Sequence, residues 1–90
     1  MDGECLNSVL ESGKRGDEYY REMNRWVLTP AKDKLRDDCL KLALIYKDSL
    51  DKLLVCLRSR KPSSRVKSRI DAAVEFQSLV TKDIKILTSH

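Results

Sequence analysis

The feature that most constrains the fold of this chain is the long segment at residues 29–59, where apolar side chains recur at helical spacing on more than one face. Steps of four and three residues place the main set on one stripe of a helix, which consists of Leu35, Cys39, Leu42, Tyr46, Leu50, Leu53 and Leu57. At about 100° per residue, Leu40, Leu44 and Val55 fall roughly on the opposite side. A helix with one neighbour needs only one apolar face, so we predict that this helix is central in its fold or covered by a partner.

Two prolines mark the ends of this helix. Pro30 disfavours helical geometry at the residue before it and suits the first turn of a new helix, which Thr29 can cap. Pro62 ends the middle helix, and Ser63 or Ser64 can cap the helix that follows.

A third helix is predicted over residues 65–87. Its stripe consists of Val66, Ile70, Ala73, Gln77, Val80, Ile84 and Leu87. Gln77, the polar member, is expected at the rim of the core or in a hydrogen bond to a neighbouring helix. Short connections between long helices predict an all-α, antiparallel up-down-up three-helix bundle that forms one domain over residues 1–90.

The first segment, residues 4–28, admits two interpretations. Val9, Gly13, Gly16, Tyr20, Met23 and Val27 fit one helical stripe. In the first interpretation Gly13 and Gly16 break the helix and Asp17 caps another, which gives four helices, because each interior glycine costs about 1 kcal/mol relative to alanine. In the second the helix is continuous, and the two glycines let a neighbouring helix approach closely. Two glycines within four residues, followed by a good cap, favour the break.

The three cysteines, Cys5, Cys39 and Cys56, are predicted to be reduced. An odd number without close spacing argues against a disulfide framework, and buried thiols behave as small apolar side chains. No metal site is predicted, because zinc requires four ligands and the only histidine is the terminal His90. Reduced thiols, and an amino-terminal segment without the basic start and apolar run of a secretory signal, predict an intracellular protein of the cytoplasm or nucleus.

The aromatic side chains are expected mainly as core anchors. Tyr20 and Tyr46 fall on the predicted core stripes, and Phe76 flanks the stripe of the third helix. Tyr19 is the candidate for an exposed ring that is available for contact or modification. The polar ends of such rings commonly lie near the surface.

Positive charge is concentrated in one part of the chain. The formal net charge of +4 is a mild excess. Residues 58–69, however, include no acidic residue and six basic ones, Arg58, Arg60, Lys61, Arg65, Lys67 and Arg69. Such a local field attracts anions, so the alternative hypothesis for function is an anion-binding module for nucleic acid or an acidic membrane surface.

Apolar residues also remain beyond those that the core stripes need. Leu40 and Leu44 lie away from the main stripe of the middle helix, and Ala72, Leu79 and Ile86 lie toward the back of the third. Exposed apolar strips on helices commonly receive an amphipathic partner helix or a second copy of the same domain. We therefore predict a protein–protein interaction domain, an adaptor or assembly module. It would bind a helix or bundle on the groove between the middle and third helices.

The sequence predicts no enzyme, no cofactor and no small-molecule substrate. A nucleophile needs a positioned base, most often a histidine, and His90 is the only one. Adjacent acidic residues such as Asp37 and Asp38 point about 100° apart on a helix, so they form no facing carboxylate pair. The segment GKRG at residues 13–16 lacks the spacing and the following Ser or Thr of a phosphate-binding loop.

One run within the middle helix resembles a known family. The sequence LALIYKDSLDKLLVCL, residues 42–57, is similar to the second helix of microtubule-interacting and trafficking domains. These domains are three-helix modules that bind short helical motifs of membrane-remodelling proteins. The similarity lies largely in leucine spacing around Tyr46, it implies no particular binding residue, and the first segment lacks the alanine-rich face of the family.

Overall fold

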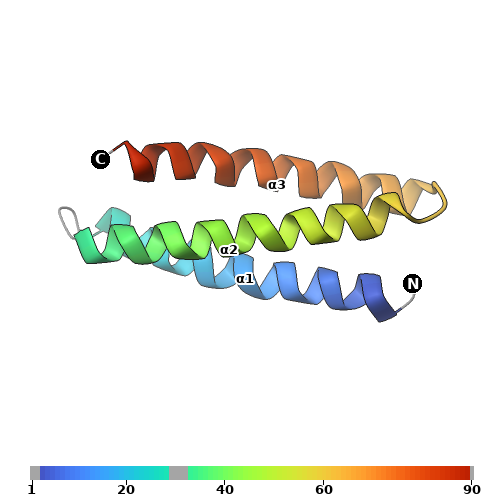
Figure 1. Ribbon diagram of the computed structural model, residues 1–90, viewed down its shortest axis with the longest axis horizontal. Coiled ribbons are helices and arrows are strands. Elements are labelled where there is room, and N and C mark those ends of the chain that lie inside the picture. Colours follow the sequence, from blue (N-terminus) through green and yellow to red (C-terminus); the bar gives the residue numbers. More distant parts are fainter. Residues whose placement is uncertain (1–2, 29–32, 90) are drawn as a thin grey trace.

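A computed structural model describes residues 3–28 and 33–89 of the chain. Three helices account for nearly all of these residues, α1 (Gly3–Leu28), α2 (Asp33–Arg58) and α3 (Ser64–Thr88), and no strand occurs among them. Consecutive helices run antiparallel, with α2 between α1 and α3 (Figure 1). The predicted all-α fold with three long helices is confirmed. The expected capping by Thr29 and the start of the middle helix at Pro30 lie outside the described residues.

The core is built around α2. Cys39, Tyr46, Leu50, Leu53 and Leu57 of the predicted stripe are all buried, and Ala43 and Leu54 extend the stripe toward its neighbours. Burial on both flanks follows from the position of α2 between two helices, each of which needs an apolar partner. The far side of α2 is uncovered in this chain, because Leu44 is 51% exposed and Val55 is 70% exposed.

The helix α1 is continuous through both glycines, so the favoured break at Gly13 and Gly16 is wrong, and with it the four-helix alternative. A Cβ atom at Gly16 would lie 3.1 Å from the ring of Tyr46 on α2, whereas one at Gly13 would have no neighbour within 4 Å. Gly16 therefore lets the tyrosine ring approach the α1 backbone closely. Packing of this kind outweighs the low helix propensity of glycine.

The buried face of α1 differs from the predicted stripe by about one residue. Tyr19, expected to be exposed, is fully buried, and Tyr20 on the predicted stripe is 40% exposed. The Tyr19 hydroxyl donates a hydrogen bond to the Asp83 carboxylate on α3, which satisfies its polar atom inside the bundle. Ser12 is also buried and donates to the carbonyl oxygen of Val9. A stripe based on apolar residues leaves out Tyr19 and Ser12, two polar side chains that can be buried because each hydroxyl has a hydrogen-bond partner within the chain.

Helix α3 follows the sequence prediction closely. The hydroxyl of Ser63 accepts a hydrogen bond from the backbone N–H of Val66, which is the geometry of an N-cap. Ala73, Val80 and Leu87 of the predicted stripe are buried. The side-chain amide of Gln77 donates to the Asp51 carboxylate on α2, so the expected hydrogen bond across helices is confirmed.

A disulfide joins Cys5 on α1 to Cys56 on α2, and the prediction of three reduced cysteines is therefore wrong. The antiparallel arrangement brings the start of α1 level with the end of α2, which places the two Cα atoms 5.8 Å apart, within the usual range for a disulfide. Spacing along the sequence could not show this, because the bridge spans 51 residues. Cys39 is the free, buried cysteine of the described chain. The disulfide removes the thiol argument for a reducing compartment.

We expect loss of the disulfide to lower the free energy of unfolding by about 2–5 kcal/mol, since the bridge closes a long loop in the unfolded chain. Chemical denaturation of wild type with and without reductant measures the loss. The variant Cys5→Ser/Cys56→Ser should match the reduced protein, and adding reductant to that variant should change nothing further. Equal stability of oxidised and reduced wild type would contradict the bridge.

The two glycines of α1 offer a matched pair of substitutions. Gly13→Ala should raise the free energy of unfolding by about 0.5–1 kcal/mol, because alanine is the better helix former and its Cβ meets nothing. Gly16→Ala should lack this gain, because its Cβ presses on the Tyr46 ring. Denaturation midpoints measure both changes. An equal gain at the two positions would show that α1 and α2 are not in close contact at Gly16.

Candidate functional site

An open groove of about 340 Å³ runs between α1 and α3, and α2 forms its floor. Tyr46, Leu50 and Leu53 of α2 lie at the bottom. The α1 wall consists of Val9, Ser12, Gly13, Gly16, Asp17 and Tyr20. The α3 wall consists of Arg69, Ala72, Ala73 and Phe76. The groove is therefore a predominantly apolar trough that all three helices build.

The groove exists because α1 and α3 pack on α2 and not on each other. Across the described chain no Cα atom of α1 comes within 8 Å of one on α3, whereas α2 packs closely against both. Small residues on both walls, Gly13 and Gly16 on α1 and Ala72 and Ala73 on α3, keep the space between the helices unfilled. Direct side-chain contact across the gap occurs at the Tyr19–Asp83 hydrogen bond.

Three tyrosines form a cluster at the floor and one wall of the groove. The ring centroids of Tyr19 and Tyr20 lie 5.0 Å apart, and Tyr46 lies 5.8 Å from Tyr19 and 6.0 Å from Tyr20. These distances are typical of stabilising aromatic pairs. Burial, followed by interactions with Tyr20, raises the pKa of Tyr46 to about 12. Burial also raises the pKa of Tyr19 and of Tyr20, and for Tyr19 the hydrogen bond to Asp83 adds to the effect.

Exposed apolar side chains continue both walls beyond the groove itself. On α3, Leu79 and Ile86 follow Ala72 and Phe76 at helical spacing, so the four share one side of the helix. On α1, Leu6 and Leu10 stand beside Val9 and Gly13. All of the larger side chains among these are substantially exposed, from 43% at Phe76 to 62% at Leu10. Uncovered apolar surface beside a groove is typical of a protein interaction site.

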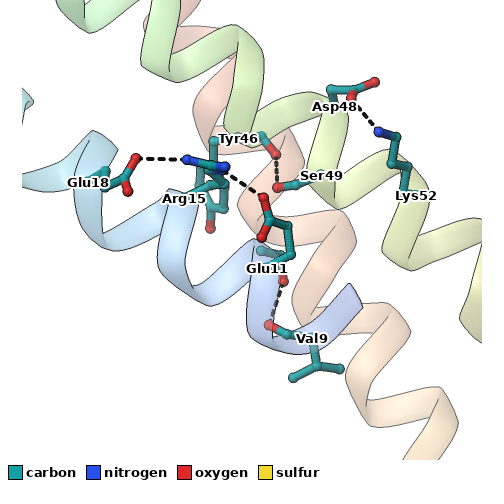
Figure 2. A network of polar contacts seen from close by, with 9 residues as sticks. Val9, Glu11, Arg15, Glu18, Tyr46, Asp48, Ser49 and Lys52 are labelled. Carbon is teal, nitrogen blue, oxygen red and sulfur yellow. Dashed lines mark hydrogen bonds and ion pairs between the residues drawn. The ribbon is translucent and has the colours of Figure 1, made fainter. Parts of the chain in front are cut away.

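The opposite side of α1 is polar. Arg15, two residues after Gly13 and hence about 200° around the helix, pairs with Glu11 at 2.8 Å and with Glu18 at 3.2 Å (Figure 2). Within α2, the buried Ser49 hydroxyl donates to the carbonyl oxygen of Tyr46 at 2.7 Å (Figure 2). Ion pairs at i,i+3 and i,i+4, such as those of Arg15, support a solvated helix face on this side of α1.

The structure separates the residues that the sequence predicted as one partner site. Ala72 lines the groove, and Leu79 and Ile86 lie on the same side of α3. Leu40 is half-buried against the core, and Leu44 is exposed on the far side of α2. The predominantly apolar groove lies between α1 and α3 and not between α2 and α3. The sequence pattern places Val9 and Tyr20 on a core stripe, so it does not predict the contribution of α1 to the groove.

The six basic residues lie around the turn between α2 and α3. Arg58, Lys61, Arg65 and Lys67 are exposed, and Arg60 and Arg69 are half-buried. No carboxylate among the described residues forms an ion pair with Arg58, Lys61, Arg65, Lys67 or Arg69. Arg69 is the member of this set that lines the groove.

The chain was compared with protein-family models, with curated proteins and with solved structures, and none of them matches it. The resemblance of residues 42–57 to microtubule-interacting and trafficking domains therefore remains local.

Two further features of the structure bear on the site. No described helix is long and apolar enough to cross a membrane. Among residues 3–28 and 33–89, no group of three or more His, Cys, Asp and Glu side chains is arranged to hold a metal ion.

The tyrosine cluster predicts a loss of stability at alkaline pH. The ordinary pKa of tyrosine is about 10, and the folded state raises that of Tyr46 to about 12, so the neutral ring is favoured on folding. This contribution is complete below pH 10 and disappears as the pH rises through about 12. The free energy of unfolding of Tyr46→Phe, measured by denaturation over this range, should fall less than that of wild type. Identical pH profiles would contradict the burial of the Tyr46 hydroxyl.

Proposed function

We propose that this domain is a non-enzymatic interaction module that binds an amphipathic helix of a partner protein in the groove between α1 and α3. The observation that carries the proposal is the apolar trough between two helices that do not pack on each other. Binding of an amphipathic helix by its apolar face is a common mode of peptide recognition.

The length of the apolar walls favours a helix over a small ligand. The α1 wall runs from Val9 to Tyr20, and the α3 wall from Arg69 to Phe76 is followed by the exposed Leu79 and Ile86. Val9 and Tyr20 are 11 residues apart, or about 16 Å at 1.5 Å per residue, which is about three helical turns. A small-molecule pocket would be enclosed and would bury most of its ligand. This groove is instead open along its length.

The helical architecture also favours a helix as the occupant. α1 and α3 both pack on α2 and not on each other. They therefore correspond to the two helices that flank the fourth helix in a four-helix bundle, and that fourth position is vacant. Helices in such bundles pack about 8–10 Å apart and share a common core. A fourth helix over Tyr46 and Leu50 would cover Phe76 on one side and Tyr20 on the other.

A second candidate function is anion binding through Arg58, Arg60, Lys61, Arg65, Lys67 and Arg69. Its support is the position of all six at one end of the molecule, together with their local excess of positive charge. Nucleic acid and an acidic membrane surface are the ligands that such a field favours. Affinity of this kind would fall steeply with salt concentration.

The groove can be tested with a displayed library of random peptides of about 20 residues, selected on the oxidised wild-type protein. We expect enriched peptides with apolar residues at i, i+3 or i+4, and i+7. Gly13→Gln, which places a side chain in open groove space, and Leu79→Gln/Ile86→Gln should each weaken their binding by at least about tenfold. Affinity is measured by fluorescence anisotropy with the synthetic peptides.

The matched control is Leu44→Gln/Val55→Gln, which makes the same kind of change on the far side of α2. It should leave peptide affinity unchanged, and circular dichroism should show that all variants remain helical. Loss of binding in this control alone would move the site to the outer face of α2. Light scattering would reveal a concentration-dependent dimer. If Gly13→Gln abolished such a dimer, the occupant of the groove would be a second copy of the chain, and the assignment to a helix of a different protein would be overturned.

A further inference from the structure

The charges along the groove have a direction. Arg69 lines the groove at the end formed by the first turns of α3, and Arg65 precedes it by four residues on the same side of the helix. The adjoining turn carries Arg58, Arg60 and Lys61, and no acidic residue occurs from residue 58 to residue 70. This end of the groove therefore presents a positive field to any occupant.

Carboxylates lie toward the other end. Asp17 lines the α1 wall near Tyr20. The Asp83 carboxylate accepts the Tyr19 hydroxyl hydrogen bond and lies on α3, seven residues beyond Phe76. Asp83 and Arg69 are 14 residues apart, which places them about 21 Å apart along the helix axis. Among the residues that line the groove, the cation Arg69 and the carboxylate Asp17 thus lie toward opposite ends of the direction in which a bound helix would lie.

We propose that the groove binds its partner helix in one direction, antiparallel to α1 and α3, with acidic residues in the carboxy-terminal turns of the partner against Arg65 and Arg69. This inference rests on the proposed function and adds the orientation and charge pattern of the ligand.

Two independent arguments give the same direction. A helix carries partial negative charge at its carboxy terminus, and cations such as Arg65 and Arg69 stabilise that end. Acidic residues there are unfavourable in an isolated helix, so the groove supplies the counter-charge that makes them favourable. The up-down-up-down arrangement of a four-helix bundle also places the fourth helix antiparallel to both of its neighbours. α1 and α3 run in the same direction (Figure 1), so one orientation satisfies both.

The reverse orientation is disfavoured by the same charges. It would place the acidic turns of the partner near Asp17 and Asp83, while its positively polarised amino terminus would face Arg65 and Arg69. Like charges across an interface suppress wrong binding modes. The charge pattern therefore selects both the sequence of the partner and its direction.

The first test is the charge requirement. Peptides selected on the wild-type protein should carry Asp or Glu in their last two turns, and Arg65→Gln/Arg69→Gln should weaken their binding by at least about tenfold. Lys67→Gln is the matched control, because Lys67 belongs to the same basic segment but points about 200° away from Arg69. It should change affinity less than about twofold. An equal loss in both variants would indicate diffuse attraction and overturn the proposal.

The second test is the direction of binding. A spin label at the carboxy terminus of a selected peptide should broaden the amide resonances near Leu6 and Arg65, and a label at its amino terminus should broaden those near Tyr20 and Ile86. The opposite pattern overturns the proposed direction. Peptides that bind, are lost in Gly13→Gln and show no acidic preference overturn this inference while leaving the proposed function intact. If no selected peptide is sensitive to Gly13→Gln, the proposed function itself fails.

The third test is competition between a selected peptide and vesicles of anionic phospholipid. Because the proposal assigns Arg65 and Arg69 to a peptide, vesicles should not displace a selected peptide from the groove. Vesicle binding that depends on Arg65 and Arg69, together with peptides that lack any acidic preference, would assign these residues to a membrane surface.

Discussion

The structure depends on the burial of α2 between two helices that both pack against it. Cys39, Tyr46, Leu50 and Leu57 occupy the centre of the core, and neither α1 nor α3 could bury its own apolar stripe without them. At Gly16 the absence of a side chain allows the Tyr46 ring to lie against the α1 backbone. The disulfide between Cys5 and Cys56 links the same two helices, α1 and α2, where α1 begins and α2 ends.

The groove is a consequence of this arrangement. Because α2 supplies most of the contacts of α1 and α3, the surfaces that those two helices turn toward each other are not needed for the core. They nevertheless carry the exposed rings of Tyr20 and Phe76, and both helices also expose larger aliphatic side chains such as Leu10 and Leu79. Apolar side chains in this position contribute little to the stability of the isolated chain. The proposed partner helix would cover those that border the groove.

Much of the fold could be predicted from sequence, because periodicity and helix caps are local signals. The stripe around Tyr46, the Ser63 cap and the hydrogen bond of Gln77 across the bundle all followed from residue spacing. The features that escaped prediction depend on which residues meet across helices. Three such features are the Cys5–Cys56 disulfide, the role of Gly16 and the burial of Tyr19 beside Asp83. Each depends on how α1 is aligned along its axis with α2 and α3. The candidate site was predicted only in its α3 half for the same reason.

The most direct test of an uncovered groove is hydroxyl-radical labelling of the oxidised protein, read out residue by residue by mass spectrometry. We expect Tyr20 and Phe76 to be modified readily, while Tyr19 and Tyr46 in the same molecule are protected. Protection of Tyr20 and Phe76 to the degree seen for Tyr19, in a protein shown to be monomeric, would mean that α1 and α3 close on each other. That result would contradict the vacant position on which the proposed function depends.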